Sequence, residues 1–397
     1  MIQAHDFVEA ARRRRFDWYA GVPCSYLSPF INYALQDPSL RYLSMANEGD
    51  AVALIAGVAL AGAGGLPFGR GISMMQNSGL GNAVSPLTSL TWTFRLPQLL
   101  IVTWRGQPGV PDEPQHSLMG AITPAILRAM EIPWELFPSE VDAIGPALDR
   151  ATAHMDDSGL PYALLMQKGT VTPYPVKPGA FAAPVRRSAA PAAVLMAHRV
   201  APEARPSRHD ALRVVVDRSP IATSVVLAST GFCGRELYSV NDRPNHLYMV
   251  GSMGCVLPLA LGLALARPDL RVIALDGDGA ALMRMGAFGS VGAYGPPNLL
   301  HLLLDNGVHE STGGQATVSP LVSFAEVAAA CGYASALETD DLAQVAAWLD
   351  APPLDGSRFA RLLTRAARSD DLPRPSIRPV EVKTRLMQHF APAAGIR

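Results

Sequence analysis

The chain has 397 residues, of which 49% are hydrophobic, and a formal net charge of -1 with an isoelectric point near 6.8. This length and hydrophobic content suffice for two or three domains with large cores. The near-neutral charge excludes a general attraction to nucleic acid or to acidic membrane surfaces, so any attraction for an anionic ligand has to be local.

The N-terminal residues predict an amphipathic helix whose basic run, residues 12–15, lies on the solvated face. They lack the order of a signal peptide, and the longest apolar stretch, residues 51–65, is too short and glycine-rich to cross a bilayer. The chain has four widely spaced cysteines: Cys24, Cys233, Cys255 and Cys331. With no Cys-x-x-Cys pair, they argue against iron–sulfur clusters, structural zinc and a disulfide framework, so we expect a reduced, cytoplasmic protein.

Strand-like apolar runs alternate with helical patterns in both halves of the chain, which predicts two α/β domains with mainly parallel sheets. The segment between the halves is rich in Pro, Ala and Arg and has little hydrophobic periodicity, as an interdomain linker does. We expect a first domain at residues 1–175, a linker at 176–208 and a second domain at 209–397.

In the first half, Glu48 follows the apolar run 42–45 and precedes the small-residue helix expected at 50–61. Its carboxylate would face the ligand side of the sheet, or it would only cap the helix and complement its dipole. In the second half, Met253 follows the run 248–250 and precedes a helix expected at 258–266. Met253 would be either a core residue, which is the commoner use of Met, or a wedge against a bound cofactor.

Two polar landmarks follow buried strands in the second half. Gly277-Asp278-Gly279 closes the apolar run 271–275, and Asp305-Asn306 closes the run 298–304. Ligands gather beyond the carboxyl ends of parallel strands, and a hard cation such as Mg²⁺ prefers oxygen ligands. The Asp278 carboxylate, the Asn306 amide and a carbonyl such as that of Val308 would hold this cation with a diphosphate. Either landmark alone would also suit an ordinary tight turn.

Together these segments resemble the thiamin diphosphate enzymes. That superfamily usually has Asn-Asn where this chain has Asp305-Asn306, and its second Asn is the metal ligand. By this resemblance, Glu48 hydrogen-bonds N1′ of the aminopyrimidine and promotes loss of the thiazolium C2 proton. The Gly251 carbonyl would accept from the 4′-amino group, and Met253 would be the wedge that bends the cofactor.

The resemblance implies two doubly wound, mainly parallel sheets, with the first domain binding the pyrimidine and the second the diphosphate. It also implies thiamin diphosphate and Mg²⁺ as cofactors, with Asp278, Asn306 and Val308 as the metal ligands. The cofactor-binding residues that it implies are Glu48, Gly251, Ser252, Met253, Gly277, Asp278, Gly279, Ala280, Asn306 and Val308.

Longer segments indicate a particular family more specifically than the short metal-binding landmarks do. They are Gly21-Val-Pro-Cys-Ser25, Met75-Gln-Asn-Ser-Gly-Leu-Gly-Asn82, Trp104-Arg-Gly-Gln-Pro-Gly109, Asp112-Glu-Pro-Gln-His116 and Asn306-Gly-Val-His-Glu-Ser-Thr-Gly-Gly-Gln315. They resemble the phosphonopyruvate decarboxylase family, with the sulfopyruvate decarboxylases as near relatives. The resemblance implies that a cofactor carbanion attacks the 2-keto acid, CO₂ leaves, and phosphonoacetaldehyde is released, in phosphonate and antibiotic biosynthesis. It further implies a homodimer or homotetramer with active sites at subunit interfaces.

An anionic substrate needs cationic groups and oriented donors. We predict substrate contacts from Ser25, Gln76, Asn77, Ser78 and Arg105, and catalytic roles for Glu48, Ser25, His116 and His309. Arg105 would alternatively form a surface or interface salt bridge, and each histidine would alternatively have a structural role.

Two departures from the family leave the protonating residue and the substrate open. Cys24 stands where many relatives have Asp, and Cys255 where close relatives often have His. The alternatives are decarboxylation of sulfopyruvate or another short 2-keto acid, a thiamin diphosphate-dependent carboligase, and a subunit that binds the cofactor without catalysis.

Overall fold

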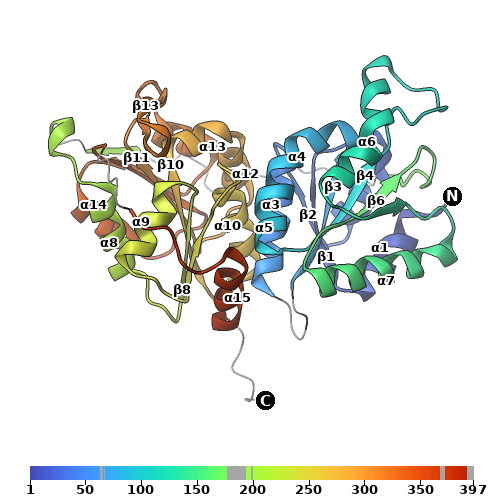
Figure 1. The fold of residues 1–397 in the computed structure, drawn as a ribbon, viewed down its shortest axis with the longest axis horizontal. Coiled ribbons are helices and arrows are strands. Elements are labelled where there is room, and N and C mark those ends of the chain that lie inside the picture. Colours follow the sequence, from blue (N-terminus) through green and yellow to red (C-terminus); the bar gives the residue numbers. More distant parts are fainter. Residues whose placement is uncertain (63–65, 67, 177–193, 198–199, 367–371, 391–397) are drawn as a thin grey trace, which may run out of the picture. The chain divides into compact units, whose positions relative to one another are not determined.

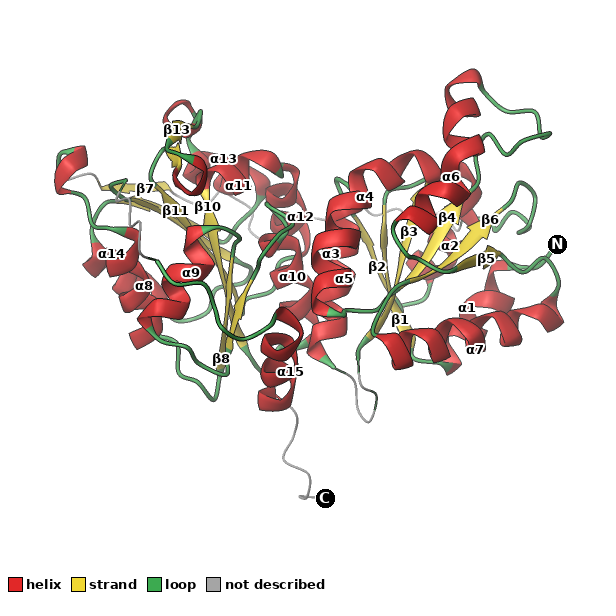
Figure 2. Ribbon diagram, in the orientation of Figure 1, coloured by secondary structure: helices red, strands yellow, loops and turns green. Residues whose placement is uncertain are grey.

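The computed structural model describes residues 1–62, 66, 68–176, 194–197, 200–366 and 372–390. The chain divides into two compact units, Met1–Ala183 and Pro184–Arg397. Each unit contains its own parallel sheet with helices on both faces (Figure 1, Figure 2). The prediction of doubly wound, mainly parallel α/β folds is therefore confirmed.

The sheet of the first unit has 6 strands in the order β2-β1-β3-β4-β6-β5, and all neighbours are parallel. The strands are β1 (Phe16–Gly21), β2 (Arg41–Ser44), β3 (Arg70–Gln76), β4 (Leu99–Thr103), β5 (Trp134–Leu136) and β6 (Tyr162–Met166). The chain passes from β1 outward to β2 and then returns to the other side of β1 for β3. The carboxyl ends of β1 and β3 therefore form a topological switch point, where open α/β sheets bind ligands.

The central strands β3 and β4 of the first unit are buried on both faces. On one face, Ile72 of β3 and Leu99 of β4 join a core cluster that contains Phe7 and Phe30. On the other face, Met75 and Leu100 join a second cluster. Because successive side chains of a strand point to opposite faces, both faces of a central strand have to be apolar, which explains the continuous hydrophobic runs in the sequence.

Helices cover both faces of this sheet. They are α1 (Ala4–Arg13), α2 (Ser28–Gln36), α3 (Glu48–Ala61), α4 (Leu80–Pro86), α5 (Trp92–Phe94), α6 (Ser117–Ala129) and α7 (Val141–Ser158), with the shorter helical turns η1 (Ser25–Leu27), η2 (Asn77–Gly79), η3 (Leu87–Thr91) and η4 (Pro114–His116). The N-cap of α3 is Asn47, whose side chain accepts a hydrogen bond from the Gly49 amide at 2.8 Å.

The main sheet of the second unit has 7 parallel strands in the order β7-β14-β15-β11-β10-β8-β9. The strands are β7 (Val194–Ala197), β8 (Ser224–Ala228), β9 (His246–Tyr248), β10 (Arg271–Gly277), β11 (Leu299–Asp305), β14 (Ser335–Thr339) and β15 (Arg358–Leu363). Strand β7 lies within the segment expected to be a linker, residues 176–208. It is short, and it adds to the edge of the sheet beside β14. Residues 177–193 and 198–199 of the expected linker lie outside the described residues.

The helices of the second unit are α8 (Arg208–Asp217), α9 (Phe232–Val240), α10 (Val256–Ala266), α11 (Asp278–Met283), α12 (Gly286–Tyr294), α13 (Phe324–Cys331), α14 (Leu342–Asp350) and α15 (Pro379–Phe390), with the turns η5 (Pro202–Ala204), η6 (Glu310–Thr312) and η7 (Ser319–Leu321). Helix α8 begins with a capping box between Ser207 and Asp210. An antiparallel hairpin, β12 (Val308–His309) with β13 (Gln315–Ala316), follows β11.

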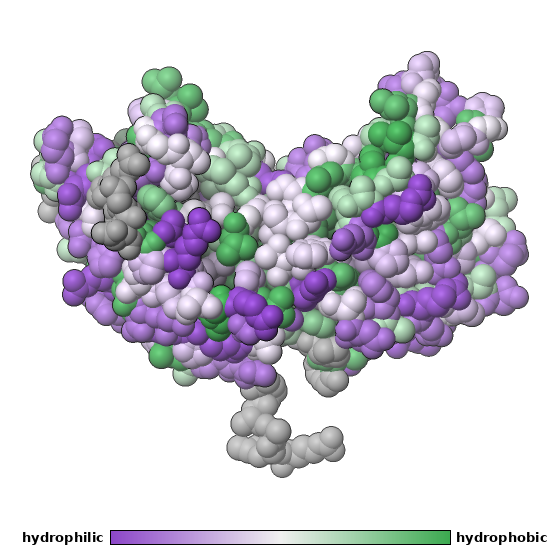
Figure 3. Space-filling model, viewed as in Figure 1, coloured by the Kyte–Doolittle hydropathy of each residue, from purple (hydrophilic) through white to green (hydrophobic). Residues whose placement is uncertain are grey.

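Apolar side chains are exposed just after this hairpin, where Val318 and Leu321 are 59% and 88% accessible. Figure 3 shows apolar atoms at this end of the unit, around the position of β13. Among the described helices, none combines the length and the apolar character needed to cross a membrane.

Candidate functional site

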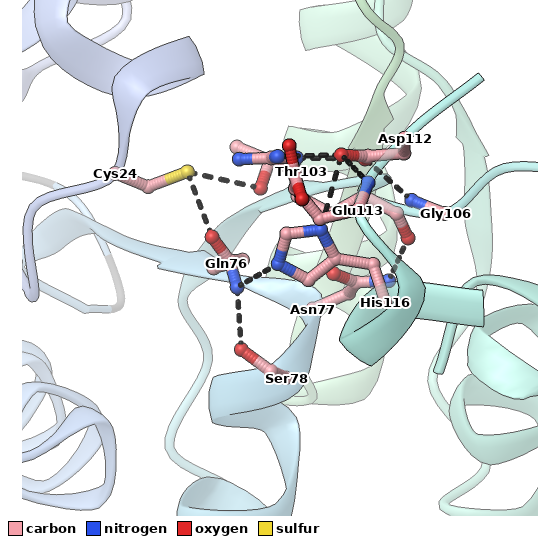
Figure 4. Close-up of polar contacts among 10 residues, drawn as sticks. Cys24, Gln76, Asn77, Ser78, Thr103, Gly106, Asp112, Glu113 and His116 are labelled. Carbon is pink, nitrogen blue, oxygen red and sulfur yellow. Dashed lines mark hydrogen bonds and ion pairs between the residues drawn. The ribbon is translucent and has the colours of Figure 1, made fainter. Parts of the chain in front are cut away.

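In the first unit, polar side chains gather where three neighbouring strands end. Cys24 follows β1, Gln76 is the last residue of β3, and Thr103 is the last residue of β4. The Cys24 Sγ lies 3.3 Å from Gln76 Oε1 and 3.5 Å from Thr103 Oγ1 (Figure 4). These residues lie at or beside the switch point, so the order of the strands is what brings them together.

Asp112 is the centre of this group, which we call the Asp112 cluster (Cys24, Gln76, Ser78, Thr103, Arg105, Asp112 and His116). Its carboxylate accepts from Arg105 Nε at 2.8 Å and Nη2 at 2.5 Å, and from the amides of Gly106 and Glu113, each at 2.8 Å. Arg105, together with these amides, holds the pKa of Asp112 well below its ordinary value despite burial, and Asp112 in turn raises the pKa of Arg105.

His116 is buried and links Asp112 to Gln76. Its Nδ1 lies 3.1 Å from Asp112 Oδ1, and its Nε2 lies 3.4 Å from Gln76 Nε2. An ionised carboxylate only accepts hydrogen bonds, so the ring carries its hydrogen on Nδ1 and accepts from Gln76 at Nε2. Gln76 also donates to Ser78 Oγ at 2.7 Å. The donors therefore point in one direction, from the Cys24 thiol through Gln76 and His116 to Asp112.

The other two residues predicted to contact substrate lie outside this chain of donors. Asn77 is buried, and its Nδ2 donates to the Arg105 carbonyl at 2.8 Å and to Thr123 Oγ1 at 2.9 Å. Its amide therefore fixes the backbone at Arg105. Ser25 is exposed at the start of η1, where its carbonyl accepts from Ser28 Oγ at 2.9 Å. Arg105, predicted to contact substrate or alternatively to form a salt bridge, is paired with Asp112.

Glu48 is the first residue of α3, but Asn47 caps the helix. The Glu48 carboxylate accepts from Asn82 Nδ2 at 2.8 Å and lies against Gly79. A Cβ atom on Gly79 would lie 2.4 Å from Glu48 Oε1, so only glycine leaves room for the carboxylate in this position. The loop that carries Gln76 and Ser78 thus also holds Glu48.

In the second unit, Asp278 follows β10 as the first residue of α11 and is buried. Its Oδ2 accepts a short hydrogen bond from Thr317 Oγ1, beyond the hairpin β12–β13. Burial and the negative charge of Asp305 raise the pKa of Asp278 above its ordinary value. A bound cation would offset both effects, so Asp278 is a favourable metal ligand.

Asn306 follows β11, and both ends of its amide are held. Its Oδ1 accepts from the Val308 amide at 3.1 Å, and its Nδ2 donates to Glu310 Oε2 at 3.1 Å. The described residues contain no group of three or more His, Cys, Asp and Glu side chains that could hold a metal. The expected ligand set, a carboxylate, an amide and a carbonyl, is of another kind and suits a hard cation such as Mg²⁺.

Three segments predicted to bind the cofactor converge on Gly279. A Cβ atom there would lie 2.4 Å from His309 Cε1 and 3.1 Å from Met253 Cε. Next to Met253, the buried Ser252 has a positive φ of 53°, so the loop after β9 makes a tight bend. Among the described atoms, a Cβ on Gly277 would meet none within 4 Å, which leaves open space at the end of β10.

The structure adds residues that the sequence reasoning did not select. Asp112 stands four residues before His116 in the segment 112–116, which resembles the family. This spacing, with Arg105 nearby in the sequence, is the signal that could have identified it. Nothing in the sequence marks Thr317 as a partner of Asp278. Asp305 has a structural role: its Oδ2 accepts from Arg361 Nε at 2.8 Å, and its Oδ1 accepts from Ser319 Oγ at 2.8 Å.

Comparison with known proteins connects this geometry to a family. Residues 229–351 match the C-terminal TPP binding domain of thiamine pyrophosphate enzymes. The chain is 43% identical to the phosphonopyruvate decarboxylase of Streptomyces viridochromogenes, over 100% of this chain and 97% of that protein. It is 41% identical to that of Streptomyces hygroscopicus, over 98% and 94% of the two chains. The sulfopyruvate decarboxylase of Methanosarcina acetivorans is 29% identical, over 82% and 81%.

Solved structures show the same fold at low sequence identity. The thiamine diphosphate-dependent 4-hydroxybenzoylformate decarboxylase of Rhodococcus jostii RHA1 is 13% identical, with a TM-score of 0.69 over 93% of this chain and 100% of that chain. The benzoylformate decarboxylase of Polynucleobacter necessarius is 12% identical, with a TM-score of 0.67 over the same shares. The family predicted from the sequence segments is confirmed by the full-length relatives: the chain belongs to the phosphonopyruvate decarboxylase family of thiamine pyrophosphate enzymes.

Proposed function

We propose that this protein is a carboxy-lyase that converts 3-phosphonopyruvate to phosphonoacetaldehyde and CO₂, with thiamin diphosphate and Mg²⁺ as cofactors. The observation that carries the proposal is the 43% identity to a phosphonopyruvate decarboxylase, which extends over nearly the full length of both chains. The reaction would belong to phosphonate natural-product biosynthesis, including that of antibiotics.

The residues of the second unit fit the cofactor's diphosphate and cation. Asp278, Asn306 and the Val308 carbonyl supply oxygen ligands, and open space at Gly277 supplies room for the diphosphate. When bound, thiamin diphosphate supplies a carbon nucleophile that adds to a 2-keto carbon and then accepts the electron pair left by CO₂. We assign Met253 to contact with the thiazolium ring and Glu48 to the pyrimidine ring, where its carboxylate would hold a proton on one of its oxygens.

The Asp112 cluster is the proposed substrate site. Arg105 and His116 supply a guanidinium and an imidazole, while Ser78 supplies a neutral hydroxyl donor that Gln76 orients. Asp112 balances the charge of Arg105 and contacts one edge of the guanidinium. The opposite edge of the guanidinium would bind the anionic substrate. Cys24 donates to Gln76, so we assign transfer of a proton to the product to His116, which would carry that proton on Nε2 in place of its contact with Gln76.

A second candidate substrate is sulfopyruvate, because a sulfopyruvate decarboxylase aligns with 82% of the chain at 29% identity. A phosphonate carries nearly two negative charges at neutral pH, by analogy with a phosphate monoester, whereas a sulfonate carries one. A site whose one arginine, Arg105, is already paired with Asp112 would bind either group. The two substrates therefore have to be compared directly.

We further propose a cytoplasmic homodimer or homotetramer. All four cysteines are free thiols in the described structure, which suits a reducing compartment. The exposed Val318 and Leu321 beside the cation site are apolar side chains of the kind that subunit contacts cover. Active sites formed between subunits would make assembly necessary for activity.

The test is turnover of phosphonopyruvate and sulfopyruvate by the purified protein with thiamin diphosphate and Mg²⁺, with identification of the product. We expect phosphonoacetaldehyde, a higher kcat/KM for phosphonopyruvate, and loss of activity when a chelator removes Mg²⁺. A higher kcat/KM for sulfopyruvate would establish the second candidate. A condensed product in place of a free aldehyde would identify a carboligase and overturn the proposal.

A further inference from the structure

A buried ion-pair network lies behind the proposed metal ligand Asn306. Arg208, the first residue of α8, donates through Nη2 to Glu236 Oε1 and to Glu310 Oε2, each at 2.5 Å. The side chains of Glu236 and Glu310 are both 7% exposed. Burial disfavours the charged guanidinium, yet the two carboxylates hold the pKa of Arg208 above its ordinary value. Two acids thus share one cation in the interior.

Only one of these two acids contacts the segment with the proposed metal ligands, residues 306–308, which we call the metal loop. Glu310 Oε2 also accepts from Asn306 Nδ2 at 3.1 Å, whereas Glu236 lies on α9 and contacts Arg208. We propose that Glu310 is a positioning residue for the cofactor's cation: held by Arg208, it fixes the Asn306 amide with its oxygen toward the metal. This inference rests on the proposed function, because the cation is the one that would carry the cofactor's diphosphate.

The chemistry of the amide explains how this works. An ionised carboxylate accepts hydrogen bonds and cannot donate them, so the side of Asn306 that faces Glu310 has to be its NH₂ group. The amide oxygen then points the other way, where one lone pair accepts from the Val308 amide at 3.1 Å and the second remains available for a cation. Without Glu310, the amide could rotate and present its NH₂ group to the metal, which cannot bind it.

The Glu310 carboxylate is itself held by Arg208, a residue outside the metal loop. Arg208 lies on α8, and its guanidinium also stands over the Phe232 ring, 5.9 Å from the ring centre. A loop residue held by a helix keeps its geometry even when the loop has no ligand, so the Asn306 oxygen is oriented before the cofactor arrives. Groups that orient a metal ligand in this way typically change metal affinity by about 10- to 100-fold when they are removed.

Glu236 provides a matched control, because it has the same burial and the same arginine partner. The experiment compares Glu310→Ala with Glu236→Ala in the full-length protein. Thiamin diphosphate binding is measured by isothermal titration calorimetry at a series of Mg²⁺ concentrations, which gives the Mg²⁺ concentration for half-maximal binding. Unfolding without cofactor is measured by urea denaturation. Neither readout depends on turnover.

We expect Glu310→Ala to raise the half-maximal Mg²⁺ concentration about 10- to 100-fold, and Glu236→Ala to change it by less than about threefold. Both variants should unfold at similarly lowered urea concentrations, since each removes one partner of Arg208. Equal Mg²⁺ dependence in Glu310→Ala and wild type, or an equal rise in both variants, would overturn the inference. Wild-type protein that binds no thiamin diphosphate with Mg²⁺ would instead overturn the proposed function.

If Glu310→Ala does not fold, the pair Glu310→Asp and Glu236→Asp gives the same comparison. Each keeps its charge near Arg208 but is one methylene shorter, so the carboxylate at position 310 withdraws from Asn306. Only the substitution at position 310 should then raise the Mg²⁺ requirement. A rise caused by the substitution at position 236 alone would contradict the assignment.

Discussion

Replacing Asp112 with Asn tests whether the Asp112 cluster is the substrate site. The carboxylate accepts from Arg105 twice, from His116 once and from two backbone amides. A hydrogen bond to a charged group contributes about 1.5–3 kcal/mol, and breaking a buried ion pair costs about 3–5 kcal/mol. Because the Arg105 side chain is 17% exposed, we expect the lower end of that range, about 3 kcal/mol, for the loss of stability.

The effect on catalysis follows from His116. If turnover loses the equivalent of the one hydrogen bond that orients the imidazole, about 1.5–3 kcal/mol, kcat/KM should fall about 10- to 150-fold. The matched control is Asp156→Asn, which breaks the ion pair of Asp156 with the buried Arg70 at the opposite end of β3. It should lower stability and leave kcat/KM within about twofold. Steady-state kinetics with urea denaturation separate the two effects, and wild-type kcat/KM in Asp112→Asn would refute the reasoning.

Gly79→Ala should displace the Glu48 carboxylate and lower kcat at least about 100-fold. The midpoint of urea denaturation should change little, because the flexible end of the Glu48 side chain can move away. The control Gly81→Ala should be active, because its Cβ would meet no described atom within 4 Å. Asp305→Asn should lower the free energy of unfolding by about 3 kcal/mol. The affinity for thiamin diphosphate, measured by calorimetry, should stay within threefold of wild type. A large loss of affinity would show that Asp305 binds the cofactor. Burial lowers the pKa of His246 to about 4, so native protein resists protonation that the unfolded chain accepts below pH 6.5. Stability should therefore fall by up to about 3 kcal/mol between pH 7 and 4, measured by urea denaturation, and less in the His246→Gln variant.

Much of the fold could be predicted because its central strands are buried on both faces. The predicted run 42–45 is shifted by one residue from β2, and the runs 271–275 and 298–304 differ from β10 and β11 only at their ends. Predictions were less accurate where local signals were weak: β9 ends at Tyr248, two residues before the predicted strand end, and β7 lies in a segment with a linker's composition. A short edge strand gains its hydrogen bonds from its neighbour, so its own sequence carries little information.

The sequence predicted which loops form the site, but not which of their side chains pair with one another. Arg105 and His116 were selected because cations suit an anionic substrate, but their partner Asp112 was overlooked. Sequence shows which groups can ionise, whereas the partner of each group depends on how loops meet at the sheet edge. Glu48 illustrates the same limit, since its environment depends on Gly79 of η2 and Asn82 of α4.

The alternation of β3 and β4 side chains between two cores has an evolutionary consequence. Gln76 and Thr103 are the last residues of these strands, beyond the side chains that fill either core. In the proposed substrate site, a mutation at the half-buried Gln76 would alter which acid is accepted at less expense in folding free energy than one at the fully buried Thr103. If the Asp112 cluster binds the substrate as proposed, the architecture permits substrate preference to drift between related anions while the scaffold underneath stays intact.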